Sequence, residues 1–152
     1  MILWPEGANL VIRNTHHYTP SLNIYNRVKY LSTIWVRGPV LRIDMKASFY
    51  QIPLTERAAR RLAFWAGDAI SGAWYAFKRL PMGHTLSLEI MQIAMSTLMG
   101  DERFTALPES VKPFIVDTWL DDARIIASSP ADLQRIGELI RERIHQCKAT
   151  VG

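Results

Sequence analysis

Two adjacent aspartates, Asp121 and Asp122, constrain the fold of this chain more than any other feature. They lie between two β-rich segments, residues 114–120 and 123–127, so we expect them at or near the tip of a hairpin. Adjacent like charges on a tight turn repel each other, and a divalent cation would relieve that repulsion. The alternative is a solvated acidic turn, because aspartate is common in turns for local hydrogen-bonding reasons. Taken alone, the pair favours the acidic turn.

A third carboxylate, Asp44, changes that balance. It lies near the end of a strand-like run, residues 40–45, that follows a Gly-Pro breaker. In a strand, one face would carry Leu41, Ile43 and Met45, and the other would carry Val40, Arg42 and Asp44. If this strand pairs beside the hairpin, three carboxylates converge at one edge of a sheet. Such a set suits two magnesium ions about 4 Å apart that serve a phosphoryl transfer, because water and substrate phosphates complete the coordination of magnesium.

The composition is that of an ordinary globular domain. The chain has 152 residues, 49% apolar and 21% charged, which fits one domain and argues against disorder. No run approaches the roughly 18 apolar residues of a membrane span, and the first residues lack the pattern of a secretory signal. We therefore expect an intracellular protein, cytoplasmic or nuclear, with no membrane partner. A net charge of +4 is compatible with a polyanionic partner.

The remaining patterns predict an α+β fold, with strands returning after helices. The expected elements are a short helix within residues 20–35, a capped turn at 55–59, strands at 61–66 and 73–79, an apolar and therefore buried helix at 85–99, and a loop at 101–112. Ser129 and Pro130 should open a last helix. Its apolar stripe consists of Leu133, Ile136, Ile140, Ile144 and Cys147. With Cys147 as the only cysteine, a disulfide within the chain is excluded.

Three runs in order resemble motifs of retroelement reverse transcriptases. Residues 42–54 resemble the first catalytic motif, residues 77–92 look like the turn and helix that contact nucleotide and template, and residues 119–122 resemble the aromatic-x-Asp-Asp hairpin. The resemblance extends from about residue 40 to about residue 147. It implies an α+β polymerase palm, with an antiparallel sheet, helices packed on one face, partial fingers and no thumb.

The resemblance also implies roles for individual residues. Asp44, Asp121 and Asp122 would be catalytic and would bind two Mg²⁺ ions, with Mn²⁺ as an alternative. Nucleotide-binding positions would be Met45, Phe49, Met82 and Gly83, and template or primer contacts would be Arg79, Gln92 and Trp119. Phe49 stands at the sugar-selecting aromatic position of the family, although core packing is the other interpretation. The implied partners are an RNA or DNA template-primer and deoxynucleoside triphosphates.

The resulting hypothesis is the core of a retrotransposon RNA-directed DNA polymerase, expected to be an incomplete fragment. Residues 1–38 would be a partial fingers lead-in, and residues 39–152 the palm core with a fingers-like hairpin at about 60–80. One alternative is a catalytically inactive retroelement remnant that binds nucleic acid or a protein partner. Another is a different two-metal nucleotidyl enzyme such as a cyclase, which the turn at residues 80–83 disfavours. Asp117 would add negative charge near the site if its strand is regular.

Overall fold

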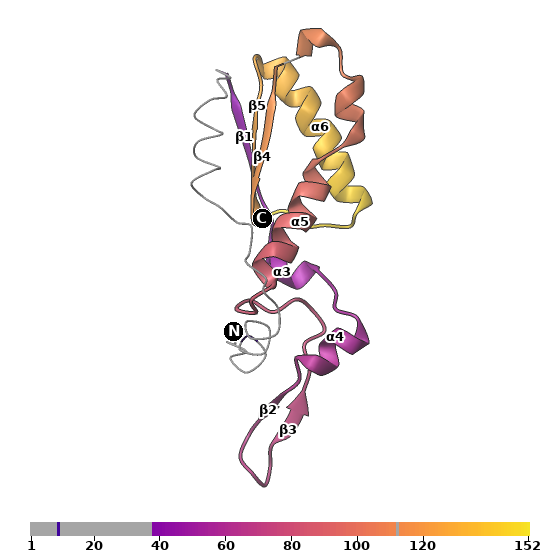
Figure 1. The fold of residues 1–152 in the computed structure, drawn as a ribbon. Coiled ribbons are helices and arrows are strands. Elements are labelled where there is room, and N and C mark those ends of the chain that lie inside the picture. Colours follow the sequence, from indigo (N-terminus) through magenta and orange to yellow (C-terminus); the bar gives the residue numbers. More distant parts are fainter. Residues whose placement is uncertain (1–8, 10–37, 112) are drawn as a thin grey trace. The chain divides into compact units, whose positions relative to one another are not determined.

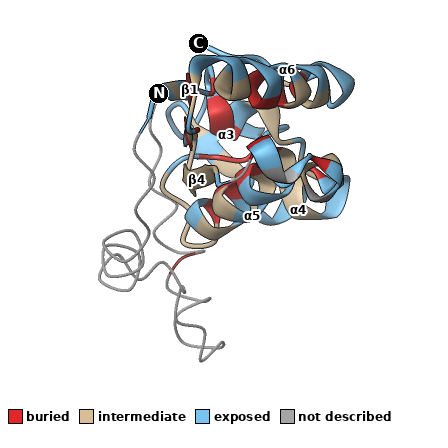
Figure 2. Cartoon of the chain, turned by 90° about the horizontal axis from the view of Figure 1, so that it is seen from above, coloured by how far each residue is buried: buried red, intermediate tan, exposed pale blue. Residues whose placement is uncertain are grey.

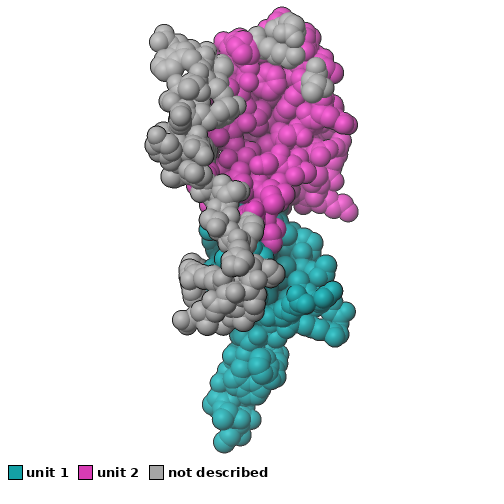
Figure 3. Space-filling view, in the orientation of Figure 1, with its two compact units in different colours: residues 1–20, 47–88 teal, residues 21–46, 89–152 magenta. Residues whose placement is uncertain are grey.

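The computed structural model describes Asn9, residues 38–111 and residues 113–152. These residues form two compact units (Figure 3). The first contains Asn9 and residues 47–88, and the second contains residues 38–46 and 89–152. The helix expected within residues 20–35 lies outside the described residues. Within the described segments, no helix is both long and apolar enough to cross a membrane.

An antiparallel sheet of three strands forms the centre of the second unit (Figure 1). Its strands are β1 (Val40–Asp44), β4 (Ile115–Trp119) and β5 (Asp122–Ile126). Their order is β1-β5-β4, so the hairpin strand β5 is central and β1 pairs with it. This arrangement confirms both the predicted strand and the predicted hairpin.

The two faces of the sheet differ sharply in exposure. The covered face carries the buried side chains of Ile43, Met45, Ala123 and Ile125. The opposite face carries Val40, Arg42, Asp44 and Arg124, all of them exposed. Because side chains alternate, a slip of one residue would move the apolar set into water, and burial of that set therefore fixes the register. The predicted alternation along residues 40–45 is confirmed.

Helix α6 (Pro130–Gln146) packs on the covered face of this sheet (Figure 2). Ser129 caps it by accepting a hydrogen bond from the Asp132 amide at 3.1 Å, as the sequence predicts. The buried stripe consists of Ile136, Ile140 and Ile144. Cys147, predicted to continue that stripe, is instead exposed. The reason is that the helix ends at Gln146 and the chain turns away, with Lys148 at a φ of 54°.

Helix α5 (Ser87–Met99) is buried along one side only. Met91, Met95 and Met99 are buried, whereas Ile93 is 58% exposed and Ile90 is 37% exposed. The predicted burial of this helix is therefore confirmed for the side with the three methionines and wrong for the side with Ile90 and Ile93, because only one side packs on the core. The segment predicted as a loop contains two short 3-10 helices, Glu102–Ala106 and Glu109–Val111.

The first unit contains two short helices and a hairpin. These elements are α3 (Ser48–Gln51), α4 (Glu56–Arg61), β2 (Phe64–Ala66) and β3 (Ala73–Tyr75). Thr55 caps α4 by accepting from the Ala58 amide. Both strands are shorter than predicted. Residues at 78–80 leave the hairpin because they pair with residues 52–54, through Leu54 N–H to the Lys78 carbonyl and Leu80 N–H to the Ile52 carbonyl. The described elements together confirm the α+β class.

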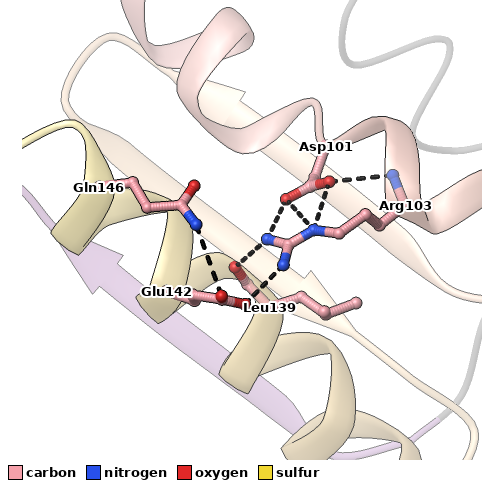
Figure 4. A network of polar contacts seen from close by, with 5 residues as sticks. All are labelled: Asp101, Arg103, Leu139, Glu142 and Gln146. Carbon is pink, nitrogen blue, oxygen red and sulfur yellow. Dashed lines mark hydrogen bonds and ion pairs between the residues drawn. The ribbon is translucent and has the colours of Figure 1, made fainter.

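A polar network ties α6 to the segment that follows α5 (Figure 4). The Asp101 side chain is only 3% exposed and pairs with Arg103 at 2.6 Å. Arg103 also donates to the Glu142 carboxylate and to the Leu139 carbonyl on α6. The Arg103 guanidinium lowers the pKa of Asp101, so this buried carboxylate stays ionised.

Candidate active site

The register of β1 and β5 brings two of the three predicted aspartates together. Asp44 is directly opposite Asp122 in the antiparallel pairing. Directly opposite residues project to the same face, with Cβ atoms typically about 4.5–5.5 Å apart. The Met45 amide, next in the chain, donates a hydrogen bond to the Asp121 carbonyl at 3.1 Å. All three aspartates therefore lie at one end of the sheet.

A two-residue turn, Leu120 and Asp121, joins β4 to β5. The flanking pair is Trp119 opposite Asp122, and Leu120 has a φ of 56°. Two-residue hairpin turns with a positive φ at the first central residue usually place glycine or asparagine there. In a residue with a Cβ this conformation costs on the order of 1 kcal/mol. The surroundings of the turn must therefore stabilise it.

Gln92, on α5, supplies hydrogen bonds to this turn. Its Oε1 accepts from the Leu120 amide at 2.8 Å. Its Nε2 donates to the Thr118 carbonyl at 3.2 Å and to the Thr118 hydroxyl at 3.1 Å. The structure thus places Gln92 against the hairpin that carries Asp121 and Asp122, and its contact with template stays a prediction.

Basic residues alternate with the carboxylates on the exposed face of the sheet. Arg42 Nε lies 2.8 Å from Asp122 Oδ1, and this hydrogen bond raises the pKa of Arg42. Arg124 pairs with Asp117 at 2.9 Å, so the extra negative charge expected from Asp117 has a partner. The sequence interpretation missed both arginine partners. The available signal was the two-residue period of a strand, which puts Arg42 on the face of Asp44 and Arg124 on the face of Asp122.

The donor set suits a hard divalent cation without forming a complete cage. Asp44 and Asp122 offer carboxylate oxygens on one face, and magnesium can be bound through one or two carboxylates with water and phosphates. Across the described ranges 38–111 and 113–152 and at Asn9, no three acidic, histidine or cysteine side chains form a group that could hold a metal ion. The residues present fit a metal that shares its coordination with substrate.

The last residues of the chain pair beside Asp44. The Gly152 amide donates to the Asp44 carbonyl at 2.9 Å, and the Lys46 amide donates to the Thr150 carbonyl at 3.0 Å. Met45 and Val151 form an isolated antiparallel bridge. The backbone at Asp44 is therefore held both by β5 and by this segment, a contact for which the sequence interpretation had no signal.

The remaining predicted site residues have varied surroundings. Phe49, in α3, is buried with 5% exposure, and Met45 is buried on the covered face of the sheet. Met82 is exposed, while Gly83 has a φ of 92° and its carbonyl accepts from the Asn9 side chain at 2.8 Å. Arg79 donates to the Gln51 carbonyl at 3.4 Å. Their roles toward nucleotide and template stay predictions.

Comparison with known families decides the identity of the fold. The family described as reverse transcriptase (RNA-dependent DNA polymerase) matches residues 9–152. This chain belongs to the reverse transcriptase family. The match covers β1, α5 and the hairpin with the two aspartates, and it confirms the resemblance seen in the sequence. Reverse transcriptases are nucleotidyltransferases that generally use divalent metal ions and act on a template-primer and deoxynucleoside triphosphates.

Proposed function

We propose that this reverse transcriptase chain is the polymerase core of a retrotransposon, adding deoxynucleotides to a primer 3′-hydroxyl on an RNA template. The observation that carries the proposal is the pairing of Asp44 with Asp122 at the end of the sheet, beside the Asp121 turn. The pairing supports the proposal because it brings together carboxylates contributed by two distant motifs.

In this proposal, Asp44, Asp121 and Asp122 hold two Mg²⁺ or Mn²⁺ ions. When bound, the ions lower the pKa of the attacking hydroxyl and stabilise the leaving pyrophosphate. The protein itself contributes a fixed geometry. Asp44 is exposed at the end of β1, so its carboxylate is accessible to a cation that also binds a substrate phosphate. Arg42 engages one oxygen of Asp122 and leaves the other for a cation.

The proposal assigns substrate contacts to other predicted residues. Phe49 would exclude the ribose 2′-hydroxyl by contact. Met45, Met82 and Gly83 would bind the incoming nucleotide. The positive φ of Gly83 is a conformation that glycine adopts at low cost, which allows close approach of the backbone to a base. Arg79 and Trp119 would contact template or primer, and Trp119 lies opposite Asp122 in the sheet.

The test is primer extension on an RNA template in Mg²⁺ or Mn²⁺, comparing the unmodified protein with Asp121→Asn. The substitution keeps the size of the side chain and removes its charge, so the expected result is loss of at least about a hundredfold in incorporation. Activity that survives the substitution would exclude the proposed role of Asp121.

A further inference from the structure

We infer that Gln92 is a positioning residue for the catalytic hairpin, which it holds by binding the backbone of the Leu120 turn. The inference deepens the proposed function and rests on it for the role of Asp121. Gln92 lies on α5, and the turn joins β4 to β5, so the contact links two elements that are distant in the sequence. The substrate contact predicted for this residue does not account for that geometry.

The chemistry of the contact requires an amide. The Leu120 N–H can only donate, and the Thr118 carbonyl can only accept. Oε1 of Gln92 therefore accepts from the Leu120 N–H, at 2.8 Å, and Nε2 donates to the Thr118 carbonyl, at 3.2 Å. A glutamate would still accept from Leu120 but would place a second oxygen against the Thr118 carbonyl. A methionine has similar length but lacks both strong hydrogen bonds.

The hairpin needs this support because its turn is strained. Leu120 adopts a φ of 56°, in the left-handed region that glycine adopts at low cost. The next residue, Asp121, accepts a hydrogen bond at its carbonyl from Met45, adjacent to Asp44. If the turn relaxes, the Asp121 carbonyl moves relative to β1. The conformation of Leu120 therefore controls how Asp121 is placed beside Asp44.

Helix α5 holds Gln92 in a fixed position because its neighbouring residues are buried. The neighbouring residues Met91 and Met95 are 4% and 0% exposed, so this part of the helix is anchored in the core. One turn further along, the Ser96 hydroxyl lies 3.3 Å from Gln92 Nε2 and 3.2 Å from the Thr118 hydroxyl. The amide is thus oriented from its own helix as well as by the hairpin.

The first experiment measures amide hydrogen exchange at Leu120 in the metal-free 152-residue chain. In Gln92→Met the exchange should be at least about tenfold faster than in the unmodified protein, because the amide loses its acceptor. Gln134→Met is the matched control, since among the described residues Gln134 bonds along the exposed side of α6, to Glu138. An unchanged exchange rate at Leu120 in Gln92→Met would overturn the inference.

The second experiment separates positioning from substrate contact. Gln92→Met should lower kcat of primer extension by about tenfold or more, with the KM for template-primer nearly unchanged. Adding Leu120→Gly should restore kcat to within about threefold of Leu120→Gly alone, because glycine adopts the turn without strain. A loss that falls on KM and is not rescued would contradict the inference and favour a template contact. If Asp121→Asn extends primers as well as the unmodified protein, the proposed role of Asp121 fails, while exchange at Leu120 still decides whether Gln92 holds the turn.

Discussion

Asp44 faces Asp122 across the β1–β5 pair, on the exposed side of the sheet. Like charges directly opposite each other destabilise a sheet. The fold partly offsets this repulsion through Arg42, whose Nε lies 2.8 Å from Asp122 and whose position on β1 is diagonal to it. The site therefore keeps an electrostatic cost that a bound cation would remove.

Arg42→Gln should increase the stabilisation that Mg²⁺ gives the protein. Because Arg42 is largely exposed, its loss should lower Tm by no more than about 4 °C without metal. The shift in Tm on adding Mg²⁺ should then be larger than in the unmodified protein, as measured by thermal unfolding. Arg124→Gln is the matched control, since Arg124 pairs with Asp117 on the same face. Equal Mg²⁺ shifts in both variants would refute the role of Arg42.

Phe49→Ala should raise the use of ribonucleotides relative to deoxynucleotides by roughly tenfold or more, because a small side chain no longer excludes the 2′-hydroxyl. The measurement is the ratio of kcat/KM for the two nucleotide classes. Phe49 is buried, so truncation to alanine also costs about 3–5 kcal/mol. Phe49→Leu provides a milder variant with the same expected direction. Unchanged selectivity in both variants would remove Phe49 from the nucleotide site.

Asp101→Asn should lower stability at neutral pH by about 1–3 kcal/mol, because the buried carboxylate loses its charge-assisted hydrogen bonds with Arg103. The pKa of Asp101 is lower in the folded protein than its ordinary value of 3.8. The contribution of ionised Asp101 to the free energy of unfolding is therefore fully present above pH 3.8. It is lost as the pH falls from there through the lower pKa of the folded protein. Urea unfolding at pH 7 and pH 3 checks this. A difference between variant and unmodified protein that stays constant with pH would contradict it.

Local patterns in the sequence predicted much of the second unit. Alternation along residues 40–45 depends only on neighbouring side chains, and the Ser129-Pro130 start of α6 depends on local capping, so both were predicted correctly. The hairpin at Asp121 and Asp122 was predicted for the same reason. Local patterns also placed Asp44 on the exposed face, while its pairing with Asp122 depended on the assumption of neighbouring strands.

Two contacts between distant residues escaped prediction. The pairing of residues 150–152 beside Asp44 and the contact of Gln92 with Leu120 depend on tertiary packing, which no local period encodes. The exposed side of α5 was missed because apolar composition alone does not show which side meets the core. The predicted division of the chain at residues 38 and 39, the metal ions and the substrate contacts remain predictions.

The most direct test of the account compares two aspartates on the same face of one sheet. Primer extension on an RNA template in Mg²⁺ is measured for Asp44→Asn and for the control Asp117→Asn. In the unmodified protein Asp117 pairs with Arg124, and it has no proposed role in metal binding. We predict that Asp44→Asn lowers incorporation by at least about a hundredfold, whereas Asp117→Asn stays within about threefold of the unmodified protein. Equal activities of the two variants would contradict a metal site built on Asp44 and the hairpin aspartates.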